Sequence, residues 1–197
     1  MITVKKYSGL EARESEALRY AGAQRSADED VIALLRSCRR ELSEARQGLV
    51  CFGVTDVVRE GDGLFLGSLR IESEDMKKYL EGCERAVIFA ATLGVLPDRL
   101  IRKYARVSPA RALMIDALCS ALAESLCDAF CQELWQSAAA EGRETRRRVS
   151  PGYGDISLDM QRDIFAFLGC ERRIGLSLNG DLLMTPTKSV TAIVGIK

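Results

Sequence analysis

The residues best suited to chemistry lie in one short stretch, Arg148-Val149-Ser150-Pro151-Gly152-Tyr153-Gly154-Asp155. Its apolar residues recur with neither the spacing of a helix nor that of a strand, so the stretch is predicted to be a loop. Pro151 fixes its own φ, while Gly152 and Gly154 permit φ > 0 and close backbone approach. Arg148 adds a planar fork of donors that matches a carboxylate. Such a loop could hold one flat ligand with main-chain groups and the Tyr153 ring, or it could be a tight turn with Tyr153 as a packing plug.

A second candidate is Glu124, in the middle of a long helical stretch and on the margin of its apolar stripe. A carboxylate there could accept hydrogen bonds from ligand hydroxyl or ammonium groups, although most helix glutamates are solvated. Asp116 is a similar but weaker candidate. About ten residues separate the end of this helix from Arg148, enough for the loop to fold back along it. We therefore expect Arg148 and Glu124 to converge, with Arg148 exposed.

Seven cysteines and the lack of histidine limit the chemistry further. Without imidazole, the chain lacks the commonest metal ligand and the usual general base. Cys119, Cys127 and Cys131 fall at helical spacing, but three thiols without a fourth ligand make a poor zinc site. We interpret them as small core residues that are reduced rather than disulfide-bonded.

The composition is that of an ordinary globular protein, with 197 residues of which 28 are basic and 28 are acidic. Zero net charge argues against a dedicated nucleic-acid binder, which normally carries a basic excess. No apolar run is long enough to span a bilayer, and the N-terminal residues lack a signal-peptide core. We expect a cytoplasmic protein folded as a single domain over residues 1–197.

Hydrophobic periodicity predicts a mixture of strands and helices before residue 92. In order, these are a strand at 1–10, helices at 11–23 and 29–45, a hairpin of strands 49–58 and 64–71, a helix at 73–83 and a strand at 86–91. Ser26 or Asp28 caps the second helix, and Ser73 opens the third. The strand at 86–91 is continuously apolar, so we expect both of its faces to be covered.

The second half of the chain is predicted to contain one long helix at 109–140, with Ser108 as its N-cap. Its inward face is expected to consist of Leu113, Ala117, Leu118, Ala121, Leu122, Leu126, Phe130 and Leu134. The other expected elements are helices at 97–106 and 158–168, the latter capped by Ser157, and a meander of strands 174–178, 182–185 and 189–196. The predicted fold class is α+β. A mixed or antiparallel twisted sheet unites the hairpin, the central strand and the meander, and the long helix packs across it.

Three segments together resemble the activation (reactivation) domain of cobalamin-dependent methionine synthase. Arg148-Val149-Ser150-Pro151-Gly152-Tyr153 is similar to the family's Arg-Pro-Ala-Pro-Gly-Tyr signature. Ala117-Leu118 and Leu122-Ala123-Glu124 look like its Ala-Leu…Leu-Ala-Glu helix. Met184-Thr185-Pro186-Thr187-Lys188-Ser189-Val190 is similar to its Met-x-Pro-x-x-Ser-Val strand pair. The matches occur in order over residues 110–195, and the length of the chain resembles that of members encoded apart from the synthase.

The resemblance implies an accessory component rather than a self-contained catalyst. The family binds S-adenosylmethionine in a shallow groove and docks on the cobalamin-binding module of methionine synthase or a related corrinoid protein after the cofactor has oxidised to cobalt(II). One electron from a flavodoxin- or ferredoxin-type donor, together with the sulfonium methyl group, restores methylcobalamin. Carried over, Glu124 and Arg148 would bind the polar ends of S-adenosylmethionine, and Ser150, Gly152 and Tyr153 would line it.

The sequence departs from the family pattern at a few positions. Gly154-Asp155 follows Tyr153 where the family has a Pro-Ala-Cys run. The family's second glutamate has no clear counterpart, and Glu141 and Glu144 lie only near its position. One alternative is therefore a non-catalytic interaction module of a corrinoid methyltransferase system that has lost the ligand. A free-standing methyltransferase is disfavoured, because the sequence shows no general base and no glycine-rich first strand–helix loop.

Overall fold

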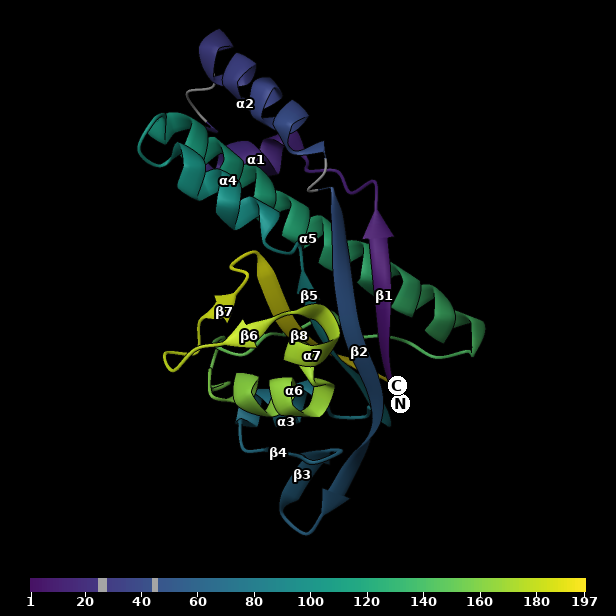
Figure 1. Ribbon diagram of the computed structural model, residues 1–197. Helices are drawn as coiled ribbons and strands as arrows, with labels where there is room; N and C mark the ends of the chain where they lie inside the picture. Colours follow the sequence, from purple (N-terminus) through teal and green to yellow (C-terminus); the bar gives the residue numbers. More distant parts are fainter. Residues whose placement is uncertain (25–27, 44–45) are drawn as a thin grey trace.

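The computed structural model describes residues 1–24, 28–43 and 46–197 and has an α+β fold (Figure 1). The strands are β1 (Ile2–Ser8), β2 (Gln47–Glu60), β3 (Gly63–Leu66), β4 (Leu69–Ile71), β5 (Arg85–Thr92), β6 (Ser177–Leu178), β7 (Met184–Thr185) and β8 (Ser189–Ile196). The helices are α1 (Glu14–Tyr20), α2 (Glu29–Glu41), α3 (Glu74–Tyr79), α4 (Leu96–Tyr104), α5 (Pro109–Ala140), α6 (Met160–Leu168) and α7 (Cys170–Ile174). The expected fold class is confirmed, with an antiparallel sheet and one long helix packed on it.

The main sheet is arranged around β2. The first part of β2 pairs with β1 on one side and with β5 on the other, and its last residues pair with β3. Within the described residues, six strands share this sheet in the order β4-β3-β2-β5-β8, with β1 also on β2. The registered pairs are antiparallel. Strands from both ends of the chain therefore meet on the two central strands.

Side chains of β5 alternate between the two faces of the sheet. Val87 and Phe89 join the core under α1, α2, α4 and α5, whereas Ala86 and Ile88 join the core under α3, α6 and α7. All four side chains are fully buried, which confirms that both faces of this strand are covered. A register slip of one residue would exchange the two faces, so the register is strongly specified.

The long helix α5 begins at the predicted Pro109 and extends for 32 residues, roughly 48 Å at 1.5 Å per residue. Figure 1 shows α1, α2 and α4 grouped around its first half, and they pack on it. The middle of α5 is consequently buried on more than one face, and Met114, Cys119 and Ala123 are buried as well as the predicted stripe. Leu113 was expected to point inward but is 54% exposed, and Leu134 is only half-buried. Periodicity could not locate a single inward face, because this helix has several buried ones.

The predicted second strand of the hairpin, 64–71, is two strands instead of one. Gly67, at φ 60°, reverses the chain so that Leu66 pairs with Leu69 and β4 runs back along β3. A two-residue turn of this kind needs a residue that tolerates positive φ, and glycine does. The turn of the predicted hairpin is present, between β2 and β3.

All three strands of the predicted C-terminal meander are present, the first two in shortened form, but only the last one joins the main sheet. β8 joins the main sheet beside β5, but β6 pairs with β7 apart from that sheet, so the expectation of one shared sheet is wrong for these two strands. Ile174, predicted as the first residue of a strand, is instead the last residue of the short helix α7. Gly169 and Gly175 both have a left-handed backbone conformation. Gly169 ends α6, and Gly175 ends α7.

Helix caps and ends agree with the sequence in part. Asp28 caps α2, accepting a hydrogen bond from the Val31 N–H at 3.0 Å, while Ser26 lies outside the described residues. Ser73 caps α3 as predicted, although α3 is shorter than expected. The helix predicted from residue 158 begins at Met160, because Ser157 forms a local turn with Asp159. None of the helices in the described ranges is both long enough and apolar enough to cross a membrane.

The cysteines of α5 lie on its buried side. Cys119 and Cys127 are fully buried, and burial raises the pKa of each thiol to about 12. Cys131 is half-buried against the same core, and burial raises its pKa as well. The interpretation as core residues is confirmed for Cys119 and Cys127 and holds in part for Cys131.

We expect Cys119 and Cys127 to resist thiol reagents in the folded protein, with Cys131 reacting first of the three. At a pKa of about 12, the thiolate is about a thousandfold scarcer than at the ordinary value of 9.0. Mass spectrometry of the protein after timed maleimide labelling, native and in urea, measures the difference. Labelling of Cys119 at the same rate in both states would contradict the buried assignment.

Candidate functional site

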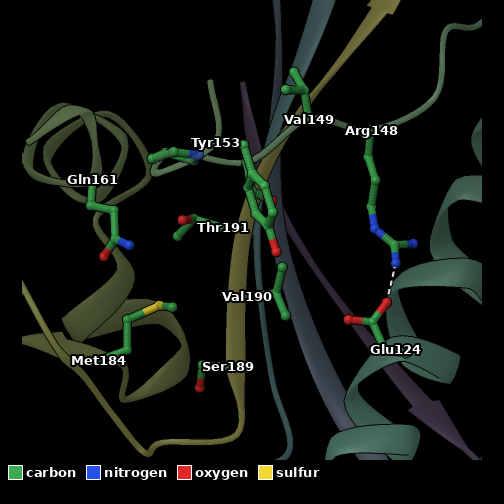
Figure 2. Close-up of a pocket in the computed structure, with 11 residues that line it drawn as sticks. Glu124, Arg148, Val149, Tyr153, Gln161, Met184, Ser189, Val190 and Thr191 are labelled. Carbon is green, nitrogen blue, oxygen red and sulfur yellow. Dashed lines mark hydrogen bonds and ion pairs between the residues drawn. The ribbon is translucent and has the colours of Figure 1, made fainter. Parts of the chain in front are cut away.

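The segment before the Arg148 loop is fixed against the outer edge of β8. Val149 and Ile193 exchange two main-chain hydrogen bonds, of 3.0 Å from the Val149 N–H and 2.8 Å from the Ile193 N–H. The Tyr79 hydroxyl donates to the Arg147 carbonyl at 2.8 Å from the other side of the chain. Since main chain is bonded on both sides of Arg148, its side chain leaves the backbone in a defined direction, toward α5 (Figure 2).

Arg148 pairs with two carboxylates of α5. Its Nη1 donates to Asp128 Oδ1 at 2.6 Å, and its Nη2 donates to Glu124 Oε2. These carboxylates are one helical turn apart, so both face the guanidinium fork. The Arg148 side chain is only 23% exposed, and the expectation of an exposed arginine is wrong because α5 covers it. Burial acts to lower the pKa of Arg148, but the bonds to Asp128 and Glu124 outweigh it and raise that pKa.

Both carboxylates belong to a polar row on α5, in which residues recur every four positions. The row consists of Asp116, Ser120, Glu124 and Asp128. Lys188, just before β8, donates to Asp116 Oδ1 at 2.8 Å and to Ser120 Oγ at 3.0 Å. Sequence reasoning missed Asp128 and Lys188 as site residues. The four-residue spacing of acidic side chains on α5 was the available signal.

An open groove of about 490 Å³ lies beside the Arg148–Glu124 pair. Figure 2 shows α5 and Arg148 on one side, α6 on the other and β8 between them. Four of the five residues predicted for a ligand site line it, namely Glu124, Arg148, Ser150 and Tyr153. The wall also includes Met184, Ser189 and Val190 from the third family-like segment, and two residues that sequence reasoning did not single out, Gln161 and Thr191. The groove therefore joins three segments that are far apart in the chain.

Gly152 is the predicted residue that does not line the groove. It has φ 91°, and its N–H is already bonded to the Ile156 carbonyl at 2.8 Å, so it shapes the loop from within. Gly154 also has positive φ, at 59°. Tyr153 is 71% exposed at the groove, which rules out the packing plug.

Asp155 anchors the far end of the loop on α3. Its carboxylate accepts hydrogen bonds from the Ser73 hydroxyl, from the Glu74 N–H at 2.8 Å and from the Asp75 N–H at 3.2 Å. The bond from Ser73, followed by those from the two N–H groups, lowers the pKa of Asp155. The place where this sequence departs from the family's Pro-Ala-Cys run thus has a structural role.

We expect Asp155→Asn to destabilise the protein at neutral pH and to have no effect in strong acid. The native state lowers the pKa of Asp155, so its contribution is complete above the ordinary value of about 3.9. That contribution shrinks as the pH falls below this value and disappears below the lowered native pKa. Urea denaturation of the wild type and the variant between pH 7 and pH 3 measures the difference.

Asp163→Asn, at an exposed position of α6, is the control for a general loss of negative charge. It should show no comparable pH-dependent difference from the wild type. A difference between Asp155→Asn and the wild type that stays constant over the whole pH range would show that the charge of Asp155 does not anchor the loop.

The fold and the groove define an α+β protein in which a long helix, an edge loop and a sheet edge form one open, charged groove. Residues 76–196 match the family model described as vitamin B12 dependent methionine synthase, activation domain. Because the match spans well over half of the chain, this chain belongs to that family, and the resemblance seen in the sequence is confirmed.

A similar solved structure is the crystal structure of the MetH reactivation domain bound to AdoHcy. It has a TM-score of 0.74 and 14% sequence identity, and the alignment covers 99% of this chain and 78% of that chain. This likeness supports the fold described above. A comparison with curated proteins gave no match.

Proposed function

We propose that this chain binds S-adenosylmethionine in the groove beside Arg148 and presents it to a cobalamin-bearing partner, either methionine synthase or a related corrinoid protein. The observation that carries the proposal is the Arg148–Glu124 pair at the groove wall. Membership in the activation-domain family supports the reaction. The similar solved structure is described as bound to AdoHcy, which is what S-adenosylmethionine becomes after it loses its methyl group.

The charges of the groove match the amino-acid end of the proposed ligand. Arg148 faces the carboxylates of Glu124 and Asp128, which leaves one excess negative charge. When the ligand binds, its carboxylate pairs with Arg148 and its ammonium pairs with Glu124, so neither side chain loses a charged partner. Asp128 meanwhile keeps Arg148 Nη1 in place. The sulfonium of S-adenosylmethionine is a further positive charge that suits the excess negative charge.

The residues of this chain position the ligand and do not transfer protons. S-adenosylmethionine supplies a sulfonium methyl group, which the partner's reduced cobalamin accepts after an electron arrives from a flavodoxin- or ferredoxin-type donor. Holding that methyl group in one orientation at an open surface is the task left to the groove. A chain without histidine is adequate for this task. A cytoplasmic location is part of the proposal, supported by the seven free cysteines.

We expect wild-type protein to bind S-adenosylmethionine in isothermal titration, and Arg148→Ala to weaken binding by one to two decades. The loss corresponds to one charge-assisted hydrogen bond, about 1.5–3 kcal/mol. Glu124→Gln, which is nearly isosteric, should weaken binding because it removes the charge that faces the ammonium. Arg148→Ala should also lower the melting temperature, since it leaves two carboxylates of α5 without their cation.

Arg147→Ala is the matched control, because Arg147 is adjacent in sequence but exposed. Its hydrogen bond to Tyr79 uses the main-chain carbonyl and survives the substitution. Binding should equal that of the wild type. If Arg148→Ala and Glu124→Gln also bind like the wild type well below their melting temperatures, the ligand lies elsewhere.

The alternative function is a non-catalytic interaction module of a corrinoid methyltransferase system. One observation favours it: Arg148 already has two carboxylate partners within the chain, so its charge is compensated without a ligand carboxylate. The two functions differ in the titration with wild-type protein. Retention of a corrinoid protein without any binding of S-adenosylmethionine would support the interaction module.

A further inference from the structure

Gln161 is a buried polar side chain whose carbonyl has no partner. The residue is only 6% exposed, and its Oε1 finds no hydrogen-bond partner within the described ranges. Burying an amide carbonyl without a partner disfavours folding, and native proteins rarely leave one without a reason. Because Gln161 also lines the groove beside Arg148, a bound ligand is a natural source of the missing donor.

The position of Gln161 in the groove indicates which part of the ligand it would contact. It comes from α6, on the wall opposite the Arg148–Glu124 pair, with β8 between the two walls (Figure 2). Its side chain points into the space beside Met184 and Thr191, which also line the groove. A carboxamide and a hydroxyl beside a thioether offer both hydrogen-bonding groups and an apolar contact, a combination that suits a flat heteroaromatic ring.

A carboxamide is complementary to the edge of adenine. Its carbonyl accepts a hydrogen bond from the exocyclic amino group, and its NH₂ donates to the adjacent ring nitrogen. The terminal torsion of glutamine is soft, so the amide of Gln161 can turn its Oε1 toward a ligand at low cost. In S-adenosylmethionine the adenine is at the opposite end from the carboxylate and the ammonium. With those charged groups on Arg148 and Glu124, the adenine extends toward the α6 wall.

We infer that Gln161 determines the specificity for the base of the ligand by accepting a hydrogen bond from the exocyclic amino group of adenine. The inference rests on the proposed function of the groove and adds to it the residue that recognises the base. It also explains the unpartnered Oε1, which acquires its donor only in the complex.

The test compares S-adenosylhomocysteine with its purine-riboside analogue, in which a hydrogen atom replaces the amino group of the base. Titration of wild-type protein should show about tenfold or stronger preference for the adenosyl compound. Gln161→Met fills the same space without an amide. It should bind the adenosyl compound about tenfold more weakly and should no longer discriminate between the two bases. Gln161→Glu keeps an acceptor and should retain the preference.

Asp163→Ala, at an exposed position on the same helix, is the control and should bind and discriminate like the wild type. The melting temperature of the free Gln161→Met protein should be equal to that of the wild type or higher, because the substitution removes an unpartnered buried carbonyl. A weaker ligand affinity without a loss of stability separates recognition of the base from a structural role.

The outcomes separate this inference from the proposed function. A preference for the adenosyl compound that persists in Gln161→Met overturns the role of Gln161 and leaves the groove as the ligand site. Wild-type protein that binds both compounds equally also overturns it, even where Gln161→Met does not fold. Wild-type protein that binds neither S-adenosylmethionine nor S-adenosylhomocysteine overturns both proposals.

Discussion

The ion pair between Arg148 and the carboxylates of α5 is the interaction on which the geometry of the groove depends. A guanidinium that is largely covered by a helix is costly unless charged partners compensate for its lost hydration. Glu124 and Asp128 provide that compensation from adjacent turns of one helix. The same contact connects the loop to the middle of α5, although the loop leaves the helix at its far end. The direction of α5 and the position of the loop on β8 are therefore coupled.

The two-sided sheet explains how distant parts of the chain come to surround one groove. α5 packs on one face of the sheet and α6 on the other, so the edge strand β8 lies between them. Residues 144–149 run along that edge, and Tyr79 fixes them from the α3 side. Asp155 then returns the chain to the start of α3. The loop is thus held at both ends by contacts with sequence-distant residues, which is how a segment without regular structure can present its side chains in fixed directions.

Features that depend on neighbouring residues were predictable, and those that depend on distant contacts were not. The glycine-rich loop, the start of α5 and the covered strand β5 follow from local backbone chemistry and periodicity. The convergence of Arg148 and Glu124 followed from the short connection between helix and loop. The unpartnered Oε1 of Gln161 and the pairing of Lys188 with Asp116 arise only when α6, β8 and α5 meet. Leu113 was misplaced because periodicity cannot distinguish between several buried faces of one helix.

The excess negative charge of the groove also bears on how ligand and product would exchange. S-adenosylmethionine carries a sulfonium that is lost with the methyl group, so the product has one positive charge fewer. Ion pairs between groups exposed to water typically contribute about 1 kcal/mol or less, and salt reduces the contribution further. In the proposed complex, the carboxylates of Glu124 and Asp128, only partly neutralised by Arg148, would therefore favour the methylated ligand by a small factor. In the proposed function this preference acts in the direction of exchange, because the product loses the favourable interaction when the methyl group leaves.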